Sequence, residues 1–422
     1  MLSLLSLMSM GAPSVYRPTL DPRLAPLAAP ATPLVANDPY FQTYSPRGGL
    51  TDNPTVAGTN GREQQMSAAA FIEGHVCQLM GPPSSNLALP AKQLSVTVYP
   101  TRTVYEMLCG ESWNLKTPIT ITFMTPQIPA NLTLMARPAS YVTFFSPPNA
   151  GSGNIQIYFD VSYQAAATED KEGAPTQIAC STNTTAMGLG YAWLGNAATQ
   201  DTPIPCADPL NCREGDNINW GQLYLGNDGD TVVVGPASDL RAKFLSQGKL
   251  GESEKCDTPI SADHMPVMAT TLDLNNQNDP GEPLSVVLAY DDDVAIRWWG
   301  TDFPGLWTQE SPTFLGMLEN AMYETDDVMA VCKAFDNAEV DKYNKVGGPK
   351  FATILSLAYR QAYSSTKLTW NTEKNIHWQF LKEISTGSDL SVSRRVSHCS
   401  SFPHMSRMAD RKLCCNGRRR WM

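Results

Sequence analysis

Hydrophobic and polar residues alternate along several segments between residues 90 and 240. The clearest run covers residues 155–161, in which Ile155, Ile157 and Phe159 take every second position. A period of two places these side chains on one face of a β-strand. Proline, glycine and asparagine fill the intervals between runs, which is typical of antiparallel sheets packed as a sandwich. We predict an N-terminal antiparallel β-sandwich over residues 18–300, with further strands at residues 94–99, 119–123, 141–145 and 231–234.

The period of the pattern changes after Trp307. The pair Ser311-Pro312 resembles an N-cap followed by a proline in the first helical turn, and apolar residues then recur at helical spacing over residues 314–322. A second helix is predicted over residues 326–343, and the Gly-Gly-Pro sequence at residues 347–349 ends it.

A third helix is predicted after this break, with one apolar face. Helices that bury a single stripe need neighbours to cover their other side. We therefore expect residues 301–392 to be the start of an α/α helical domain that is truncated in this chain. The apolar face of the third helix consists of Phe351, Ile354, Leu355, Ala358 and Ala362.

The two ends of the chain differ in composition from the rest. Residues 1–17 begin with a short apolar run that resembles a signal-peptide core, although a basic segment before it is missing. Residues 393–422 form an aberrant basic tail, in which eight basic residues from Arg394 onward face one acid, Asp410. We interpret this tail as an appended segment or, preferably, as the product of a shifted reading frame.

Composition excludes several classes of function. The net charge is −10 and the pI is about 5.0, which argues against a nucleic-acid partner. Apolar runs fall short of the ~20 residues that a membrane span needs.

Ten cysteines without a metal-binding motif favour an oxidising compartment. They predict neither a metal nor a cofactor. Cys206 and Cys212 could close a small loop. Glycosylation sequons at Asn131 and Asn183 fit a secreted protein.

Short stretches that run in order across residues 30–390 and end with Phe380–Ser385 resemble the fungal and bacterial glutaminase A family. The resemblance implies a secreted hydrolase that converts glutamine to glutamate and ammonia, with a β domain followed by a six-hairpin helical toroid. The stretch Phe380–Ser385 is the last match, and the segment at residues 53–62 departs from the family pattern. The other matching stretches are Pro33–Phe41, Thr97–Tyr105, Thr122–Pro126, Tyr158–Asp160, Asn219–Gly221, Leu288–Asp292 and Ala358–Gln361.

Hydrolysis of a side-chain amide needs a nucleophile or activated water, a proton donor for ammonia, and donors that stabilise the oxyanion. Glu383 and Lys382 are the first candidates, because they lie in the last matching stretch. The alternative is that both are ordinary polar residues near a helix end.

Acidic and aromatic residues near residue 300 supply further candidates. Asp291, Asp292 and Asp293 follow an apolar strand, and clustered carboxylates repel unless something neutralises them. Asp291 and Asp292 could therefore bind a substrate or a cation, line a domain junction, or form only an exposed acidic turn. Trp299 lies between Trp298 and Trp307, and these rings could stack on a sugar or pack between two domains.

Two other functions remain open at the level of sequence. The six-hairpin architecture is shared with many glycosidases, so a carbohydrate-active enzyme that binds a glycan is one alternative. A non-catalytic β-sandwich that binds a ligand without turnover is the other. A small-molecule substrate, and no membrane partner, is expected of the leading hypothesis.

Overall fold

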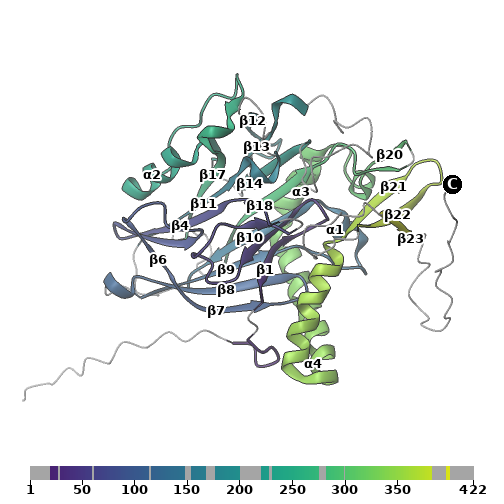
Figure 1. Ribbon diagram of the computed structural model, residues 1–422, viewed down its shortest axis with the longest axis horizontal. Helices are drawn as coiled ribbons and strands as arrows, with labels where there is room; N and C mark the ends of the chain where they lie inside the picture. The colour runs from purple at the N-terminus through teal and green to yellow at the C-terminus, as the bar shows by residue number, and fades with distance from the viewer. Residues whose placement is uncertain are drawn as a thin grey trace, which may run out of the picture.

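The computed structural model describes residues 20–26, 29–58, 61–113, 116–147, 154–167, 176–199, 220–227, 231–274, 282–298, 300–382 and 396–399. More of these residues lie in strands than in helices, and the strands form several sheets (Figure 1).

The largest element is a nine-stranded sheet in which all neighbouring strands are antiparallel. Its two edges are a two-residue strand and a longer strand at residues 92–98. In spatial order the strands are β16 (Ile260–Ser261), β12 (Gln177–Thr184), β13 (Gly190–Asn196), β14 (Gln222–Asn227), β18 (Leu284–Asp291), β10 (Ala139–Phe145), β9 (Thr117–Met124), β8 (Arg102–Cys109) and β7 (Lys92–Val98).

A six-stranded sheet faces it across one hydrophobic core. Ile157 and Phe159 of the smaller sheet join Ile121 and Phe123 of the larger one in this core. The alternation along residues 155–161 therefore faces inward, and the β-rich N-terminal part predicted from the sequence is confirmed. In spatial order the strands are β15 (Val233–Pro236), β17 (Pro266–Asp273), β11 (Ile155–Ser162), β4 (Met66–Ile72), β5 (His75–Met80) and β6 (Ala88–Pro90), and only β5 and β6 pair in parallel.

Helices cover the outer face of each sheet. Helix α2 (Ala237–Gln247) packs Phe244 against Tyr158 of the smaller sheet. Helix α3 (Phe314–Tyr323) packs Phe314 against Tyr224 of the larger sheet. Burial of these aromatic side chains fixes the helices on the sandwich.

The second and third predicted helices are the two parts of α4 (Thr325–Tyr363), which lies beside the sandwich near β7 in Figure 1. Gly348 breaks the helix with φ 76° and ψ −174°, a conformation that residues with a side chain rarely adopt. Among the described residues, no helix has the length and apolar character needed to cross a membrane.

The prediction that the apolar face of the third helix is buried is wrong. Ile354 is 53% exposed and Phe351 36%, whereas Ser356 and Arg360 are buried. Arg360 on the polar side of this helix finds hydrogen-bond partners in the sandwich, so this side faces inward and the apolar stripe points outward.

The interval expected to be helical also contains strands. The hairpin of β21 (Thr366–Asn371) and β22 (Ile376–Lys382) follows α4, and β23 (Val396–Cys399) pairs with β22. Lys382 therefore ends a strand and not a helix. The described part of residues 301–392 comprises helices α3 and α4 with strands and does not include a complete toroid.

The remaining elements are short. The strands β1 (Ala31–Ala36), β2 (Gln42–Pro46) and β3 (Val56–Ala57) form a separate sheet, and β19 (Ile296–Trp298) pairs with β20 (Thr301–Phe303). The short helices are α1 (Leu132–Ala136) and the 3₁₀ turns η1 (Glu111–Trp113), η2 (Tyr163–Ala165), η3 (Ala197–Thr199), η4 (Ala262–His264) and η5 (Leu306–Gln309).

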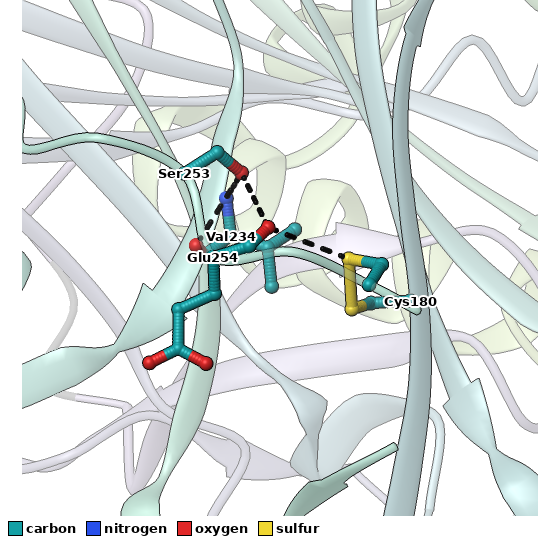
Figure 2. The surroundings of a disulfide bond; sticks show 5 residues. Cys180, Val234, Ser253 and Glu254 are labelled. Atoms are coloured by element: carbon teal, nitrogen blue, oxygen red, sulfur yellow. Dashed lines mark hydrogen bonds between the residues drawn. A yellow bond between two sulfur atoms is a disulfide. The ribbon is translucent and has the colours of Figure 1, made fainter. Parts of the chain in front are cut away.

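Within the described part of the chain, two disulfides cross-link the sandwich. The Cys77–Cys109 bond joins β5 of the smaller sheet to β8 of the larger one. The Cys180–Cys256 bond joins β12 to the segment after α2 (Figure 2). Beside it, the Ser253 hydroxyl accepts a hydrogen bond from the Val234 N–H at 3.0 Å. The predicted Cys206–Cys212 loop, the signal peptide and most of the basic tail lie outside the described residues.

Candidate functional site

A largely buried lysine lies between two buried carboxylates at the end of the sandwich that adjoins the β21–β22 hairpin. Lys367 Nζ is 2.6 Å from Asp38 Oδ2 and 2.7 Å from Asp292 Oδ2. Asp38 lies in the turn between β1 and β2, Asp292 follows β18 directly, and Lys367 is the second residue of β21. We call these three residues the Lys367 cluster.

Local hydrogen bonds fix the Asp38 carboxylate. Its Oδ1 accepts from the backbone N–H of Tyr40 at 2.9 Å and of Phe41 at 3.0 Å, an arrangement typical of an Asx turn. The other carboxylate oxygen, Oδ2, is thereby left to accept from Lys367.

The charges of the cluster keep the lysine protonated. Although burial opposes the charged form, the carboxylates of Asp292 and Asp38 raise the pKa of Lys367 above its ordinary value. Lys367 is therefore an ammonium at neutral pH, which can orient and neutralise carboxylates but cannot act as a nucleophile or a base.

The acid next to the cluster titrates in a different range. Burial raises the pKa of the Asp291 carboxyl to about 7, and the charges of Asp292 and Asp293 add to this effect. Burial also raises the pKa of Asp292, against the influence of Lys367. Asp291 can therefore exchange a proton near neutral pH, a property that acid–base catalysis requires.

Replacing Asp291 by asparagine is expected to weaken the pH dependence of stability. Because the folded-state pKa is raised, the contribution of this carboxyl is complete below its ordinary value of 3.8 and is lost as the pH rises through about 7. The Asp291→Asn variant has no carboxyl at this position and does not lose stability in this way. It should be more stable than the wild type by roughly 1–3 kcal/mol at pH 8 and not at pH 4, as measured by urea unfolding.

The exposed residue Asp257 offers a matched control for this experiment. The Asp257→Asn variant should follow the wild type at both pH values. A difference between Asp291→Asn and the wild type that stays constant from pH 4 to pH 8 would contradict the raised pKa.

Gly221, the last residue of the stretch Asn219–Gly221 that resembles the glutaminase A family, packs directly on Asp291. Gly221 adopts φ 75°, and a Cβ atom at this position would lie 2.1 Å from the Asp291 carbonyl oxygen. The Tyr290 hydroxyl donates a hydrogen bond to the Trp220 carbonyl oxygen. Only glycine fits such a close approach at positive φ, so Gly221 helps to position Asp291.

A small cavity borders the Lys367 cluster. Its volume is about 10 Å³, and its polar lining includes Asn37, Asp38, Gln127 and Lys367. Gln127 Oε1 is buried and has no hydrogen-bond partner among the described residues. The cavity has room for about one water molecule, so an amino-acid substrate cannot enter it.

A second buried polar network joins α4 to the sandwich. Asp336 Oδ1 accepts from the Thr101 N–H at 2.8 Å, and its Oδ2 accepts from Arg102 Nε at 2.7 Å. Arg360 donates from Nη1 to Thr103 Oγ1 at 2.9 Å and from Nη2 to the carbonyl oxygen of residue 34 at 3.1 Å. Burial lowers the pKa of Arg360 to about 10, so it stays charged at neutral pH.

The structure brings some of the predicted site residues together. Asp291 and Asp292 lie at the Lys367 cluster, and Lys367 supplies the neutralising cation. The backbone of Lys382 lies at the same end of the hairpin as Lys367, because Thr366 pairs with Leu381. Glu383 and Trp299 lie outside the described residues. Among the described residues, no group of three or more histidine, cysteine or acidic side chains could hold a metal ion.

The sequence analysis missed Asp38 and Lys367. Asp38 lies inside the matching stretch Pro33–Phe41, which could have identified it. Lys367 lies in a strand without a motif, and only the fold brings it to Asp38, 329 residues away.

The two sequons differ in their surroundings. Asn131 is half-buried and caps α1, where its Oδ1 accepts from the Leu134 N–H at 3.2 Å. Asn183 is exposed on β12. The indole of Trp298 packs against Phe380, and that of Trp307 against Phe314, as expected of rings that pack between elements.

The family model described as "Domain of unknown function (DUF5127)" matches residues 101–341, which run from the start of β8 into α4. The chain belongs to the DUF5127 family. The matched region of this DUF5127 protein contains Asp291, Asp292 and Asp336, whereas Asp38 and Lys367 lie on either side of it.

Two curated sequences are similar to this DUF5127 protein over most of its length. Glutaminase A of Aspergillus oryzae is 26% identical over 87% of this chain and 52% of its own length. The "probable glutaminase" of Arthroderma benhamiae is 23% identical over 85% of this chain and 43% of its own length. These similarities confirm the resemblance to the glutaminase A family, and the chain spans about half the length of both relatives.

The alignment with the solved structure of HI1317 covers 62% of this chain and 99% of the HI1317 chain. The sequence identity is 8% and the TM-score is 0.26. A score at this level carries no information about the fold or function of the DUF5127 protein.

Proposed function

We propose that this chain is part of a secreted glutaminase-like amide hydrolase that releases ammonia from glutamine. The observation that carries the proposal is the similarity to Glutaminase A over 87% of the chain. The two disulfides and the exposed Asn183 sequon support an oxidising, extracellular setting. The helical toroid that the resemblance implies belongs to the same proposal.

Asp291 and the Lys367 cluster have separate roles in this proposal. Asp291 exchanges a proton near neutral pH, as departure of ammonia requires. The ion pairs of Lys367 hold the β21–β22 hairpin on the sandwich. The end of this hairpin carries Lys382 and continues to Glu383, the first candidates for direct contact with the substrate.

The adjoining cavity is too small for glutamine, since its volume is about 10 Å³. The substrate must therefore bind outside it, on a surface to which the hairpin end contributes. The Lys367 cluster acts in this scheme as a positioning element for the β21–β22 hairpin.

The test is an assay of the purified full chain for ammonia release from L-glutamine, with heat-denatured protein as the blank. L-Asparagine and a set of aryl glycosides are assayed in parallel. We expect ammonia from glutamine in excess of asparagine, and no sugar release. A folded chain that releases no ammonia from glutamine would exclude amide hydrolysis as its activity, and one that releases sugar instead would favour the carbohydrate-active alternative.

A further inference from the structure

A groove of about 510 Å³ lies at the sandwich rim where β6 leads into β7. Figure 1 shows β6 at the end of the sandwich opposite to the β21–β22 hairpin, so the groove is separate from the Lys367 cluster. Its volume falls within the range of small-molecule sites, about 300–1,000 Å³. The side chains that matter for its chemistry are those of Leu89, Pro90, Lys92, Leu108, Glu111 and Trp113.

The aromatic wall of the groove is fixed in place. The Trp113 indole stacks on the His75 imidazole, with ring centroids 4.7 Å apart and an interplanar angle of 18°. The strand before Trp113 ends at Cys109, whose disulfide to Cys77 joins the two sheets beneath the groove. A half-buried indole supported in this way is a preformed surface for a ligand, which reduces the entropic cost of binding.

The rim of the groove is polar and electrically neutral. Lys92 Nζ lies 3.0 Å from Glu111 Oε1, and the two side chains are 56% and 53% exposed. The ammonium and the carboxylate provide hydrogen-bond donors and acceptors beside the apolar wall. Because their charges cancel, this rim does not favour a ligand with a net charge.

These features restrict the chemistry of the ligand. The groove is open, so the outer side of a bound molecule stays in water while its inner side contacts Leu89, Pro90 and Trp113. A wholly apolar molecule would remain partly exposed to water and would lose much of the gain from burial. A pyranose ring has an apolar C–H face and hydroxyl groups around its edge. The face can contact the apolar wall, and the hydroxyl groups can contact the polar rim and water.

We propose that this groove binds a neutral glycan through a pyranose ring stacked on Trp113. The ring hydroxyls accept hydrogen bonds from Lys92 and donate them to Glu111. No bond is made or broken here, so the groove holds a carbohydrate whatever reaction the other end of the molecule performs.

The test is isothermal titration of the full chain with neutral hexasaccharides of glucose, xylose, mannose and N-acetylglucosamine. We expect at least one to bind with a dissociation constant of about 1 mM or lower. Trp113→Ala should weaken that binding at least tenfold, and the Lys92→Met, Glu111→Gln double variant at least fivefold. Thermal unfolding of each variant checks that it is folded.

Trp378→Ala removes an indole from the hairpin at the other end of the molecule and is the matched control. It should bind the same sugar as tightly as the wild type. Three results would overturn the proposal: no binding of any sugar up to about 10 mM by the folded chain, unchanged binding by folded Trp113→Ala, or equal weakening by Trp378→Ala. Failure of the glutaminase assay would leave this result unaffected.

Discussion

Replacing Asp336 by asparagine is expected to lower the free energy of unfolding by about 3–5 kcal/mol, because the change leaves a buried arginine without its counter-charge. Asp336 is fully buried and accepts from Arg102 Nε at 2.7 Å, while Arg102 itself is 8% exposed. Asparagine has nearly the same shape, so the loss reports the charge and not a cavity. Denaturant unfolding at pH 7 measures it.

The control for this prediction lies on the same helix. Asp341 also forms an ion pair with an arginine, Arg23, at 3.0 Å, but its side chain is 53% exposed. Asp341→Asn should cost less than about 1 kcal/mol, since water screens exposed pairs. Equal losses for the two variants would show that burial of the Asp336 pair has no energetic consequence.

Replacing Lys367 by methionine should have a comparable effect with a clear pH dependence. The variant leaves the buried carboxylates of Asp38 and Asp292 without their cation, at a cost of about 3–5 kcal/mol at pH 8. Burial already raises the pKa of Asp292, and removal of Lys367 raises it further. A raised carboxyl pKa stabilises the fold at low pH and ceases to do so as the pH rises through it.

The difference in stability between Lys367→Met and the wild type should therefore shrink as the pH falls from 8 to 4. Urea unfolding at intervals across this range measures it. Lys374→Met changes an exposed lysine in the turn of the same hairpin and should cost less than about 1 kcal/mol at every pH. A Lys367→Met deficit that does not change with pH would argue against charge repulsion as its cause.

The alternation of apolar and polar residues predicted the β-rich part of the fold well, because each strand buries its own apolar face. Residues 155–161 lie in the core as their alternation indicates. The break in α4 was also predictable, because Gly348 and Pro349 disrupt a helix through their own backbone chemistry.

Local pattern failed where distant polar partners decide the orientation. The second part of α4 has an apolar stripe that includes Ile354, yet Arg360 on its other side is the buried residue. The hydrogen-bond partner of Arg360, Thr103, is 257 residues away in sequence. No periodicity within the helix contains that information.

The same reasoning explains the partial success at the site. Asp291 and Asp292 stand out because they follow an apolar strand, and the repulsion between them implied a neutralising partner. The identity of that partner depended on a contact between Asp292, directly after β18, and Lys367 of β21. It could not be derived without the fold.

The long-range contacts of the N-terminal strands also set the timing of folding during synthesis. Asp38 meets Lys367 across 329 residues, and Arg360 meets the carbonyl group of residue 34 across 326. At about 5–20 residues per second, a ribosome takes roughly 16 to 65 seconds to add the intervening chain. Throughout that time Lys367 and Arg360 do not exist, so β1 can pair with β2 long before these two contacts are able to form.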